Sequence, residues 1–349
     1  MEWLLVVWFI LWGVLWGVYF LLDGYDFGIS MWIPLLGASS ERERTAMYQA
    51  TGPFWDGNEV WLITAGGVTF AAFPLAYAVL FSSLYTPLLI LLFCLILRGV
   101  IYELRFQWEN RYYRITCDGI GVVASLVAVI LLGVAFSNLF RGLPLLYDAT
   151  EKFYMFQGNI LALLHPYCLL GGVVFVLLFL VHGALYLAWR VEGDLHKKAL
   201  YMAKLTWPIF LIAFLVYVAL TFFWAGLIKN YLNSPLLFVL PLACTVSFLL
   251  SGYYMYFKNS PGKGVLASCG GILTFTLTGV IGMYPNLIPS RVMPFEANSL
   301  SIFNSAVVSS FPTLKIMLGV AGVLVPIVII YQIWAHKRLS WPVKADLGT

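Results

Sequence analysis

Charged residues are scarce in this sequence. Asp, Glu, Lys and Arg make up 10% of its 349 residues, whereas hydrophobic residues make up 62%. The mean hydropathy is +0.90. Charge this sparse excludes a water-soluble globular fold and predicts an all-α integral membrane protein. The net charge of +4 gives no sign of nucleic-acid binding, and no nucleic-acid partner is expected.

Paired cysteines are also lacking. The sequence has five cysteines, and none of them forms a CxxC pair. Most lie inside apolar runs, where a free thiol packs as a small hydrophobic side chain. We therefore expect these cysteines to be core residues, and we expect neither disulfides nor metal ligands among them. The five are Cys94, Cys117, Cys168, Cys244 and Cys269.

Histidines are few, and their positions give little support for heme binding by this chain. Heme ligation inside a helix bundle requires axial donors on facing helices. His182 is the only histidine deep in an apolar run, and no clear His or Met opposes it. His165 lies near the start of a helix, whereas His196 and His336 lie in basic segments and are expected to be solvated. We expect no metal or heme ligand in this chain.

The sequence is rich in long apolar runs instead. A bilayer core needs about 20 apolar residues per helix, and on this criterion the chain has about nine spans. The first lacks the basic start of a cleaved signal peptide, so we expect it to be a retained helix. The division between the second and third spans is marked only by Phe73-Pro74 and Ser82-Ser83. The predicted spans are 4–36, 57–78, 82–103, 117–137, 163–189, 206–228, 236–257, 265–284 and 314–336.

The order of the spans suggests two four-helix halves and one peripheral helix. The halves would cover about 4–137 and 163–284, and the peripheral helix about 314–336, all within one polytopic membrane domain over residues 1–349. Transporters also use repeated halves. The repetition therefore does not discriminate between functions.

Lys and Arg are unevenly distributed between alternate loops. With nine spans and an outside N-terminus, about 15 of the 20 Lys and Arg residues fall on one side and about 5 on the other. Positive residues favour the cytoplasmic side, so the N-terminus is predicted outside and the C-terminus in the cytoplasm. The longest external loops would be 138–160 and 285–313, and no extramembrane domain is large enough for catalysis.

Ionisable residues stand at the start of the second predicted span, in the stretch TGPFWDGNEVWLITAGGVTFAAFP over residues 51–74. Asp56 and Glu59 are three positions apart and share a helical face. One interpretation is a capping box, with Asp56 as the N-cap. The other is a cluster at the membrane surface that takes up protons or ions, because charge there is costly without a function. The two are compatible, since a capping carboxylate can also titrate.

Further acids lie in the first span. Asp23 and Asp26 are three positions apart. They mark either a helix break, helped by Gly24 and Gly28, or a functional pair that needs partners or water inside the membrane.

Two later polar residues also have two interpretations. Arg98 follows an apolar run and either extends to the interface or pairs with Asp26 or Asp56. Asp118 begins a predicted helix and fits a capping residue.

Distinctive motifs occur from the first predicted helix to the last. They are FLLDGYDFGISMWIPLLG, GPFWDGNEVWLITAGGVTFAAFPLAYA, RGVIYELR, GMYPNLIPS, SLSIFNSA and LVPIVIIY. Together they resemble subunit II of the cytochrome bd-type quinol oxidases over nearly the whole chain, and WDGNEVWLITAGG is highly specific. The chain is shorter than some members, and the loop expected over 228–235 is short.

The resemblance implies a heterodimer with a heme-bearing subunit I. That subunit would hold two b hemes, one d heme and the quinol site, whereas this chain would hold no heme. The complex would oxidise quinol, reduce O₂ to water and build a membrane potential without pumping protons. It would lie in a bacterial or archaeal cytoplasmic membrane, with lipids and small single-helix subunits as further partners.

The resemblance also implies a proton path from the cytoplasm through this chain. Asp56 matches the acid of the WDGN motif and would form its entrance, ordered by Trp55, near which a structural quinone can lie. At Glu103 only the charge matches, since other members can have Asp there. The candidate proton-path residues are Asp23, Asp26, Trp55, Asp56, Glu59, Arg98 and Glu103.

Two other functions use the same residues differently. A secondary transporter or cation channel would bind its substrate near the membrane midplane, between broken helices of both halves. Here the acids gather toward the predicted cytoplasmic ends, which favours proton uptake. A cytochrome with its own heme would need ligands that the histidines do not provide.

Overall fold

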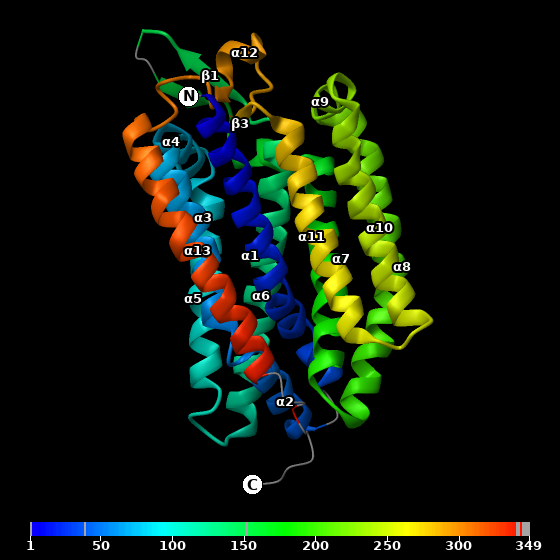
Figure 1. The fold of residues 1–349 in the computed structure, drawn as a ribbon. Coiled ribbons are helices and arrows are strands. Elements are labelled where there is room, and N and C mark those ends of the chain that lie inside the picture. The colour runs from blue at the N-terminus through cyan, green and yellow to red at the C-terminus, as the bar shows by residue number, and fades with distance from the viewer. Residues whose placement is uncertain (1, 38–39, 151–152, 340–342, 344–349) are drawn as a thin grey trace.

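The computed structural model describes residues 2–37, 40–150, 153–339 and 343, and in them the chain forms a bundle of long helices. Eight helical segments are long and apolar enough to cross a membrane, which agrees with the predicted all-α integral membrane protein. Figure 1 shows β1 and β3 at one end of the bundle and α2 at the other. We call these the strand end and the α2 end. The eight segments are Glu2–Leu36 (α1), Tyr85–Leu104 (α5), Arg111–Arg141 (α6), Pro166–Arg190 (α7), Gly193–Trp224 (α8), Pro235–Tyr256 (η2 and α10), Pro261–Met283 (α11) and Phe311–Leu339 (α13).

Shorter elements connect these helices. Two small antiparallel pairings, β1 with β2 and β3 with β4, lie in the predicted external loops 138–160 and 285–313. A bridge between Leu143 and Ser290 joins the two loops. The shorter elements are α2 (Glu41–Thr51), α3 (Trp55–Ala72), α4 (Pro74–Ser83), β1 (Leu145–Asp148), β2 (Phe153–Phe156), η1 (Ile160–Leu163), α9 (Ile228–Asn233), η2 (Pro235–Phe238), α10 (Val239–Tyr256), β3 (Asn286–Ile288), α12 (Phe295–Asn298) and β4 (Leu300–Ser301).

The span predicted over 57–78 is wrong as a single helix. The chain forms α3 up to Ala72 and α4 from Pro74, with Phe73 between them. Proline has no backbone N–H and disfavours a helical conformation in the residue before it. Phe73 accordingly has φ −133° and ψ 62°. Helix α4 occupies the expected loop at the strand end and leads into α5 (Figure 1).

Of the two interpretations of Asp23 and Asp26, the helix break is wrong. Helix α1 runs without interruption from Glu2 to Leu36, through Asp23 and Asp26. It contacts α3, α6, α7 and α11 and is therefore surrounded by other helices. Those neighbours supply partners for its carboxylates, so neither solvent nor a kink is needed to accommodate them.

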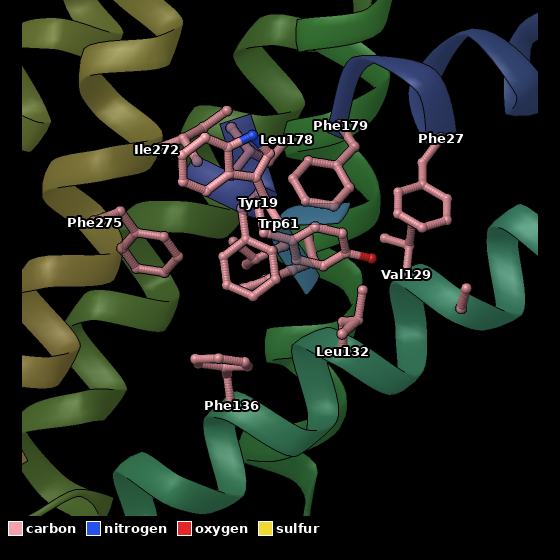
Figure 2. Packing of buried hydrophobic residues seen from close by; sticks show 14 of the residues in the cluster. Tyr19, Phe27, Trp61, Val129, Leu132, Phe136, Leu178, Phe179, Ile272 and Phe275 are labelled. Atoms are coloured by element: carbon pink, nitrogen blue, oxygen red, sulfur yellow. The ribbon is translucent and has the colours of Figure 1, made fainter. Parts of the chain in front are cut away.

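Aromatic side chains fill much of the core around α1 (Figure 2). Phe20 of α1 meets Phe136 of α6 and Phe175 of α7 edge to face, with ring centroids 4.9 and 5.2 Å apart. Phe27 and Phe179 lie with their rings nearly parallel, at a centroid distance of 6.2 Å. Aromatic pairs of this kind add about 0.5–1.5 kcal/mol each beyond their burial. They hold α1 in a fixed position against α6 and α7.

Helices α1 and α7 approach so closely at Gly28 and Gly183 that neither position has room for a side chain. A Cβ at Gly28 would lie 1.9 Å from the Phe179 carbonyl oxygen, and one at Gly183 would lie 2.7 Å from Gly28 Cα. Small residues allow this backbone contact between membrane helices. Beside it, Trp32 Nε1 donates to the Leu180 carbonyl oxygen at 2.8 Å. The crossing therefore fixes the half of α1 that carries the aspartates.

Helix α13 lies on the outside of the bundle. None of the residues in its most apolar stretch is buried, which agrees with the predicted peripheral helix. The other long helices follow one another as α1, α3, α5 and α6, then α7, α8, α10 and α11, and α1 packs on both groups. That the two groups are repeated halves stays a prediction.

Candidate functional site: an acid–arginine network

Arg98 of α5 is buried and joins two carboxylates from other helices. Its guanidinium forms a bidentate ion pair with Asp23 of α1, with Nη1–Oδ1 at 2.7 Å and Nη2–Oδ2 at 2.9 Å. Its Nε donates to Glu59 Oε1 of α3 at 3.2 Å, and its Nη2 contacts the same oxygen. The guanidinium carbon lies 4.0 Å from the Phe27 ring centroid. Arg98 therefore connects α1, α3 and α5.

This geometry corrects both expectations for Arg98. The side chain is only 1% exposed, so it does not extend to the interface. Its partners are Asp23 and Glu59, and not the predicted Asp26 or Asp56. Three helices converge on this position, and sequence spacing within one helix could not identify the pairing.

Asp26 lies on the same face of α1, three positions beyond Asp23. Asn58 donates from its Nδ2 to Asp26 Oδ2 at 2.7 Å and to the Tyr25 hydroxyl at 2.6 Å. The other oxygen, Asp26 Oδ1, has no hydrogen-bond partner among the described residues. We call the five residues Asp23, Asp26, Asn58, Glu59 and Arg98 the acid–arginine network.

The local sequence explains how the network forms. Helix α3 starts at Trp55, so Asn58 and Glu59 lie in its first turns, near the α2 end. Trp12 Nε1 donates to Thr69 Oγ1 at 2.9 Å and holds α3 alongside α1. Adjacent residues point in different directions around a helix, and here Asn58 meets Asp26 while Glu59 meets Arg98 of α5.

The charges in this network do not balance. It contains three carboxylates and one guanidinium. Asp23 and Asp26 are 0% exposed, and the Glu59 side chain is 21% exposed. Uncompensated charge is costly inside a protein and more so inside a membrane. Binding of protons relieves the excess negative charge, so the network is chemically suited to hold and exchange protons.

Asp56 lies apart from this network. It is an exposed residue in the first turn of α3, whose N-cap is Phe54 without a side-chain capping bond. The capping-box prediction is therefore wrong, because the helix starts one residue before Asp56. Its carboxylate still lies at the positive end of the helix dipole. Asp56 and Glu59 are one turn apart, so Asp56 stands outside the network on the same helix.

Trp55 and Glu103 belong to a different feature, a pocket of about 410 Å³ next to the network. Trp55 stacks on Tyr102, with ring centroids 5.1 Å apart and an interplanar angle of 13°. The Tyr102 hydroxyl pairs with the Thr51 hydroxyl at 2.9 Å. The pocket is lined by Tyr48, Gln49, Gly52, Pro53, Trp55, Tyr102, Glu103 and Phe106.

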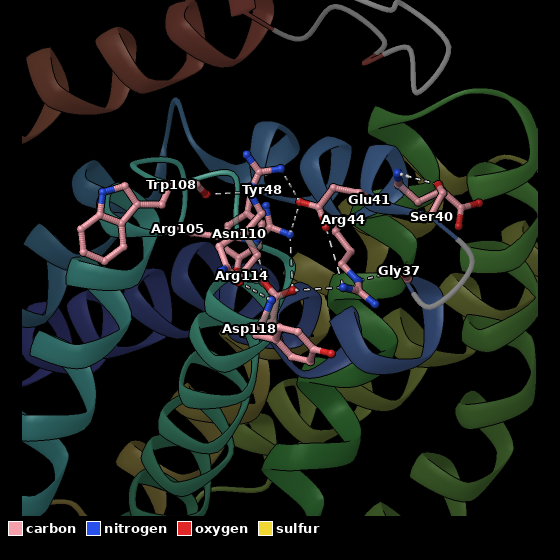
Figure 3. Close-up of polar contacts among 12 residues, drawn as sticks. Gly37, Ser40, Glu41, Arg44, Tyr48, Arg105, Trp108, Asn110, Arg114 and Asp118 are labelled. Atoms are coloured by element: carbon pink, nitrogen blue, oxygen red, sulfur yellow. Dashed lines mark hydrogen bonds and ion pairs between the residues drawn. The ribbon is translucent and has the colours of Figure 1, made fainter.

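A second charged cluster lies at the α2 end (Figure 3). Arg105 donates from Nε to Asp118 Oδ1 at 2.6 Å, and its Nη2 lies 2.8 Å from Glu41 Oε1. Tyr48 donates to Asp118 at 3.0 Å. Burial, followed by the Asp118 charge, raises the pKa of the Tyr48 hydroxyl, so Tyr48 stays a donor. The cluster comprises Glu41, Arg44, Tyr48, Arg105, Arg114 and Asp118.

This cluster corrects the expectation for Asp118. Helix α6 begins at Arg111, and its cap is Asn110, whose side chain accepts from Tyr112 N and Tyr113 N. Asp118 lies two turns inside the helix and binds Arg105 instead. The cluster ties α2 to the connection between α5 and α6. The cluster contains three arginines and two acids, so its charges nearly balance. We assign it a structural role.

The histidines occupy four different environments. His182 is buried, with Nε2 2.9 Å from the Leu21 carbonyl oxygen and Nδ1 3.0 Å from Ser268 Oγ. Both ring nitrogens are engaged, so this residue does not fit a heme ligand. His165 caps α7. His196 is half-buried, with Nδ1 2.6 Å from the Ala188 carbonyl oxygen.

The expectation that His196 and His336 are solvated is wrong, because both are half-buried and hydrogen-bonded through a ring nitrogen. His336 makes further contacts. Its Nε2 lies 3.2 Å from the Tyr25 hydroxyl, and its ring stacks on Phe54 at 4.1 Å. Among the described residues, no group of three or more His, Cys, Asp or Glu is arranged to hold a metal ion. Four of the five cysteines are buried core residues, as predicted, and Cys269 is half-buried.

Sequence reasoning missed three members of these polar sites. Asn58 was part of the recognised motif, but its amide was given no role. Tyr25 lies between the two network aspartates in the DGYD motif, and this position is the signal in the sequence that could have indicated its role. His336 is more than 300 residues from Tyr25 in the sequence, and no local pattern connects the two.

Comparison with known proteins identifies the family. The model of the cytochrome bd terminal oxidase subunit II family matches residues 4–339. The chain is 32% identical to the cytochrome bd-I ubiquinol oxidase subunit 2 of Escherichia coli K12, over 97% of this chain and 94% of the relative. It is also 32% identical to the cytochrome bd ubiquinol oxidase subunit 2 of Bacillus subtilis, over 96% of both chains.

The fold agrees with a solved structure as well. A chain of the bd oxidase from Geobacillus thermodenitrificans superposes with a TM-score of 0.75 at 15% identity, over 96% of this chain and 98% of that chain. The sequence matches and the fold lead to one conclusion. The chain belongs to the cytochrome bd terminal oxidase subunit II family and is a membrane subunit of an oxidoreductase complex.

Proposed function

We propose that this chain supports a heme-bearing subunit I in quinol oxidation and carries protons toward it. The partner's two b hemes and d heme supply the electron transfer and the reduction of O₂ to water. Membrane potential then arises from proton uptake on one side, without pumping. The observation that supports this role is the acid–arginine network, which holds three carboxylates around one guanidinium.

The proposed route begins at the α2 end, which carries the Arg-rich cluster and is assigned to the cytoplasm. Exposed Asp56 takes a proton from water and passes it one turn along α3 to Glu59. Glu59 shares the Arg98 guanidinium with Asp23. A proton on either acid removes a negative charge from the buried site, and the guanidinium stays paired with the other acid.

Substitution of Asp56 by Asn tests the proposed entrance. We expect the assembled complex to keep its reduced-minus-oxidised heme spectrum, while oxygen consumption slows. The matched control is Asp194→Asn, which changes another exposed acid in the first turn of a helix, paired only with Lys197. Equal turnover in both variants, with full heme content, would contradict the entrance at Asp56.

The partner and cofactor assignments have a direct test. The complex purified through this chain should contain a second large subunit and show b- and d-type heme bands. Small single-helix subunits and bound lipids would appear in the same preparation. A colourless preparation of this chain alone would contradict the oxidase assignment and favour the ion-transporter alternative.

A structural quinone is proposed for the 410 Å³ pocket beside Trp55. Its aromatic lining, which includes Tyr48, Tyr102 and Phe106, offers flat faces for a quinone ring. Trp55→Ala should lower the quinone extracted per heme while leaving heme content unchanged. Unchanged quinone content would place the molecule elsewhere in the complex.

A further inference from the structure

The last turns of α13 make specific polar contacts, although the most apolar stretch of this helix has no buried residue. Gln332 accepts from Trp61 Nε1 at 3.1 Å and donates to the Gly57 carbonyl oxygen at 3.2 Å. Arg190 of α7 donates to the Leu339 carbonyl oxygen at 2.9 Å. These contacts hold the end of α13 over the first turn of α3, where the acid–arginine network begins.

His336 lies between these anchoring contacts and faces Tyr25. Its Nδ1 is 2.9 Å from the Gln332 carbonyl oxygen. A carbonyl only accepts, so Nδ1 carries the hydrogen, and in the neutral ring Nε2 is an acceptor. The Tyr25 hydroxyl therefore donates to Nε2 across 3.2 Å. The Tyr25 oxygen in turn accepts from Asn58 Nδ2 at 2.6 Å.

These bonds link α13 to the network through the Asn58 amide, which holds Tyr25 and Asp26 side by side but does not itself relay protons. Asn58 uses its two N–H groups for the Tyr25 oxygen and for Asp26 Oδ2. The Tyr25 oxygen and the Asp26 carboxylate thus lie against the same amide nitrogen. His336 is half-buried, whereas Tyr25 and Asp26 are 2% and 0% exposed. The linked side chains therefore run from a partly accessible imidazole to a buried carboxylate.

We propose that His336 and Tyr25 form a second proton route, which delivers protons to Asp26 independently of Asp56. The inference rests on the proposed proton-conducting function of the acid–arginine network. It assigns the peripheral helix α13 a part in that function.

The proton transfer balances in two steps. His336 first binds a proton from water at Nε2, after the Tyr25 hydroxyl has turned toward Asp26. Then Nε2–H breaks as the proton passes to the Tyr25 oxygen, while the earlier Tyr25 proton passes to a water molecule between Tyr25 and Asp26, and that water gives one of its own protons to the Asp26 carboxylate. The imidazole returns to its neutral form, Tyr25 again donates to Nε2, and Asp26 is protonated. One proton has moved inward, and there is no other net change in bonding.

The surrounding groups are compatible with this route. Arg190 of α7 is a charged group on a neighbouring helix, and its guanidinium carbon lies 5.2 Å from the centroid of the Phe54 ring, which in turn stacks on His336. Tyr25 also stacks on Tyr186 of α7, with centroids 3.8 Å apart and an interplanar angle of 5°. The stack fixes the Tyr25 ring, so its hydroxyl can turn while the ring stays in place.

The same stack provides a matched pair of variants. Tyr25→Phe removes the hydroxyl that links His336 to the network. Tyr186→Phe removes the neighbouring buried hydroxyl, which contacts neither His336 nor Asn58 in the hydrogen bonds described above. Both keep the ring stack, so only the first interrupts the proposed route.

The test measures oxygen consumption and proton uptake by the purified complex in liposomes. Because the Asp56 route remains, Tyr25→Phe alone should lose about half of its turnover, and in the Asp56→Asn background the loss should reach roughly 10²-fold. His336→Gln, which keeps a polar side chain but cannot carry the proton, should behave like Tyr25→Phe. Tyr186→Phe should match the parent in both backgrounds, and all variants should keep the parent heme spectrum.

The outcomes separate this inference from the proposed function. If Asp56→Asn slows turnover and Tyr25→Phe adds nothing in that background, the second route is wrong and the first stands. The proton-conducting function itself is wrong if Asp56→Asn, Glu59→Gln and Asp26→Asn all leave turnover unchanged in heme-complete complexes. Equal losses from Tyr25→Phe and Tyr186→Phe would show that the hydroxyls serve packing only, which also overturns the second route.

Discussion

Two regions of the helix bundle differ in the charge and bonding of their polar groups. The acid–arginine network pairs ionisable side chains across three helices. In contrast, a cavity of about 650 Å³ between α8, α10 and α11 is lined almost entirely by apolar groups. No Asp, Glu, Lys, Arg or His is among the described residues that line it.

Three threonine hydroxyls in the wall of the cavity are neutral and bond within their own helices. The hydroxyls of Thr221, Thr245 and Thr278 each donate to a carbonyl four residues earlier in the same helix, at 2.8, 2.9 and 2.7 Å. Such bonds need no neighbouring helix. Polar groups in the network depend on other helices, so their loss should disturb the assembly of the bundle, whereas loss of the Thr245 hydroxyl, which bonds within α10, should not.

The largest effect is expected from Arg98→Met. This change leaves Asp23 and Glu59 without their cation, and breaking a buried ion pair in this way costs about 3–5 kcal/mol. Assembled complex should decrease, and its thermal unfolding temperature should fall. Arg111→Met is the control, since Arg111 is an exposed first residue of α6. Equal thermal stability of both variants would remove the structural role assigned to Arg98.

A somewhat smaller effect is expected from Gly28→Ala at the α1–α7 crossing. The added Cβ would meet the Phe179 carbonyl at 1.9 Å. Backbone must then move, and overpacking of this kind costs about 3 kcal/mol. Gly119→Ala is the matched control, because a Cβ there meets nothing within 4 Å. Thermal unfolding of the two complexes should differ clearly, and identical curves would show that the crossing can relax.

The smallest effect is expected from Thr245→Val in the cavity wall. The variant loses one hydroxyl but keeps the shape of the side chain. The lost hydrogen bond is to the Pro241 carbonyl of the same helix, so no contact between helices is broken. We expect a loss of about 0.5 kcal/mol or less and unchanged oxygen consumption. A loss of stability as large as that expected for Arg98→Met would contradict the proposed difference between the two regions.

Local sequence correctly predicted the features that depend on composition and motif. Apolar runs identified eight of the nine predicted spans as long helices, and α13 as peripheral. The WDGNEVW, DGYD and RGVIYELR motifs indicated the family and drew attention to four of the five network residues, Asp23, Asp26, Glu59 and Arg98. These features follow from hydrophobicity over about 20 residues and from recognisable short strings, and neither depends on distant parts of the chain.

Helix ends and breaks were predicted less well. Asp56 and Asp118 both fit capping patterns, yet α3 is capped at Phe54 and α6 at Asn110. The acids of α1 fit a helix break, yet the helix continues through them. In each case the carboxylate does not mark the helix end or break that the local pattern indicated. Asp23 and Asp118 instead pair with arginines, and a single-helix pattern does not show these partners.

The sequence by itself determined that this chain spans a membrane, where most of its long helices lie and to which family it belongs. Only the tertiary structure decided that Arg98 joins Asp23 to Glu59, that Asn58 holds Asp26, and that His336 reaches Tyr25. The physical reason is that hydrophobic burial is set by composition along each helix. The pairing of a buried charge depends on which faces of distant helices meet.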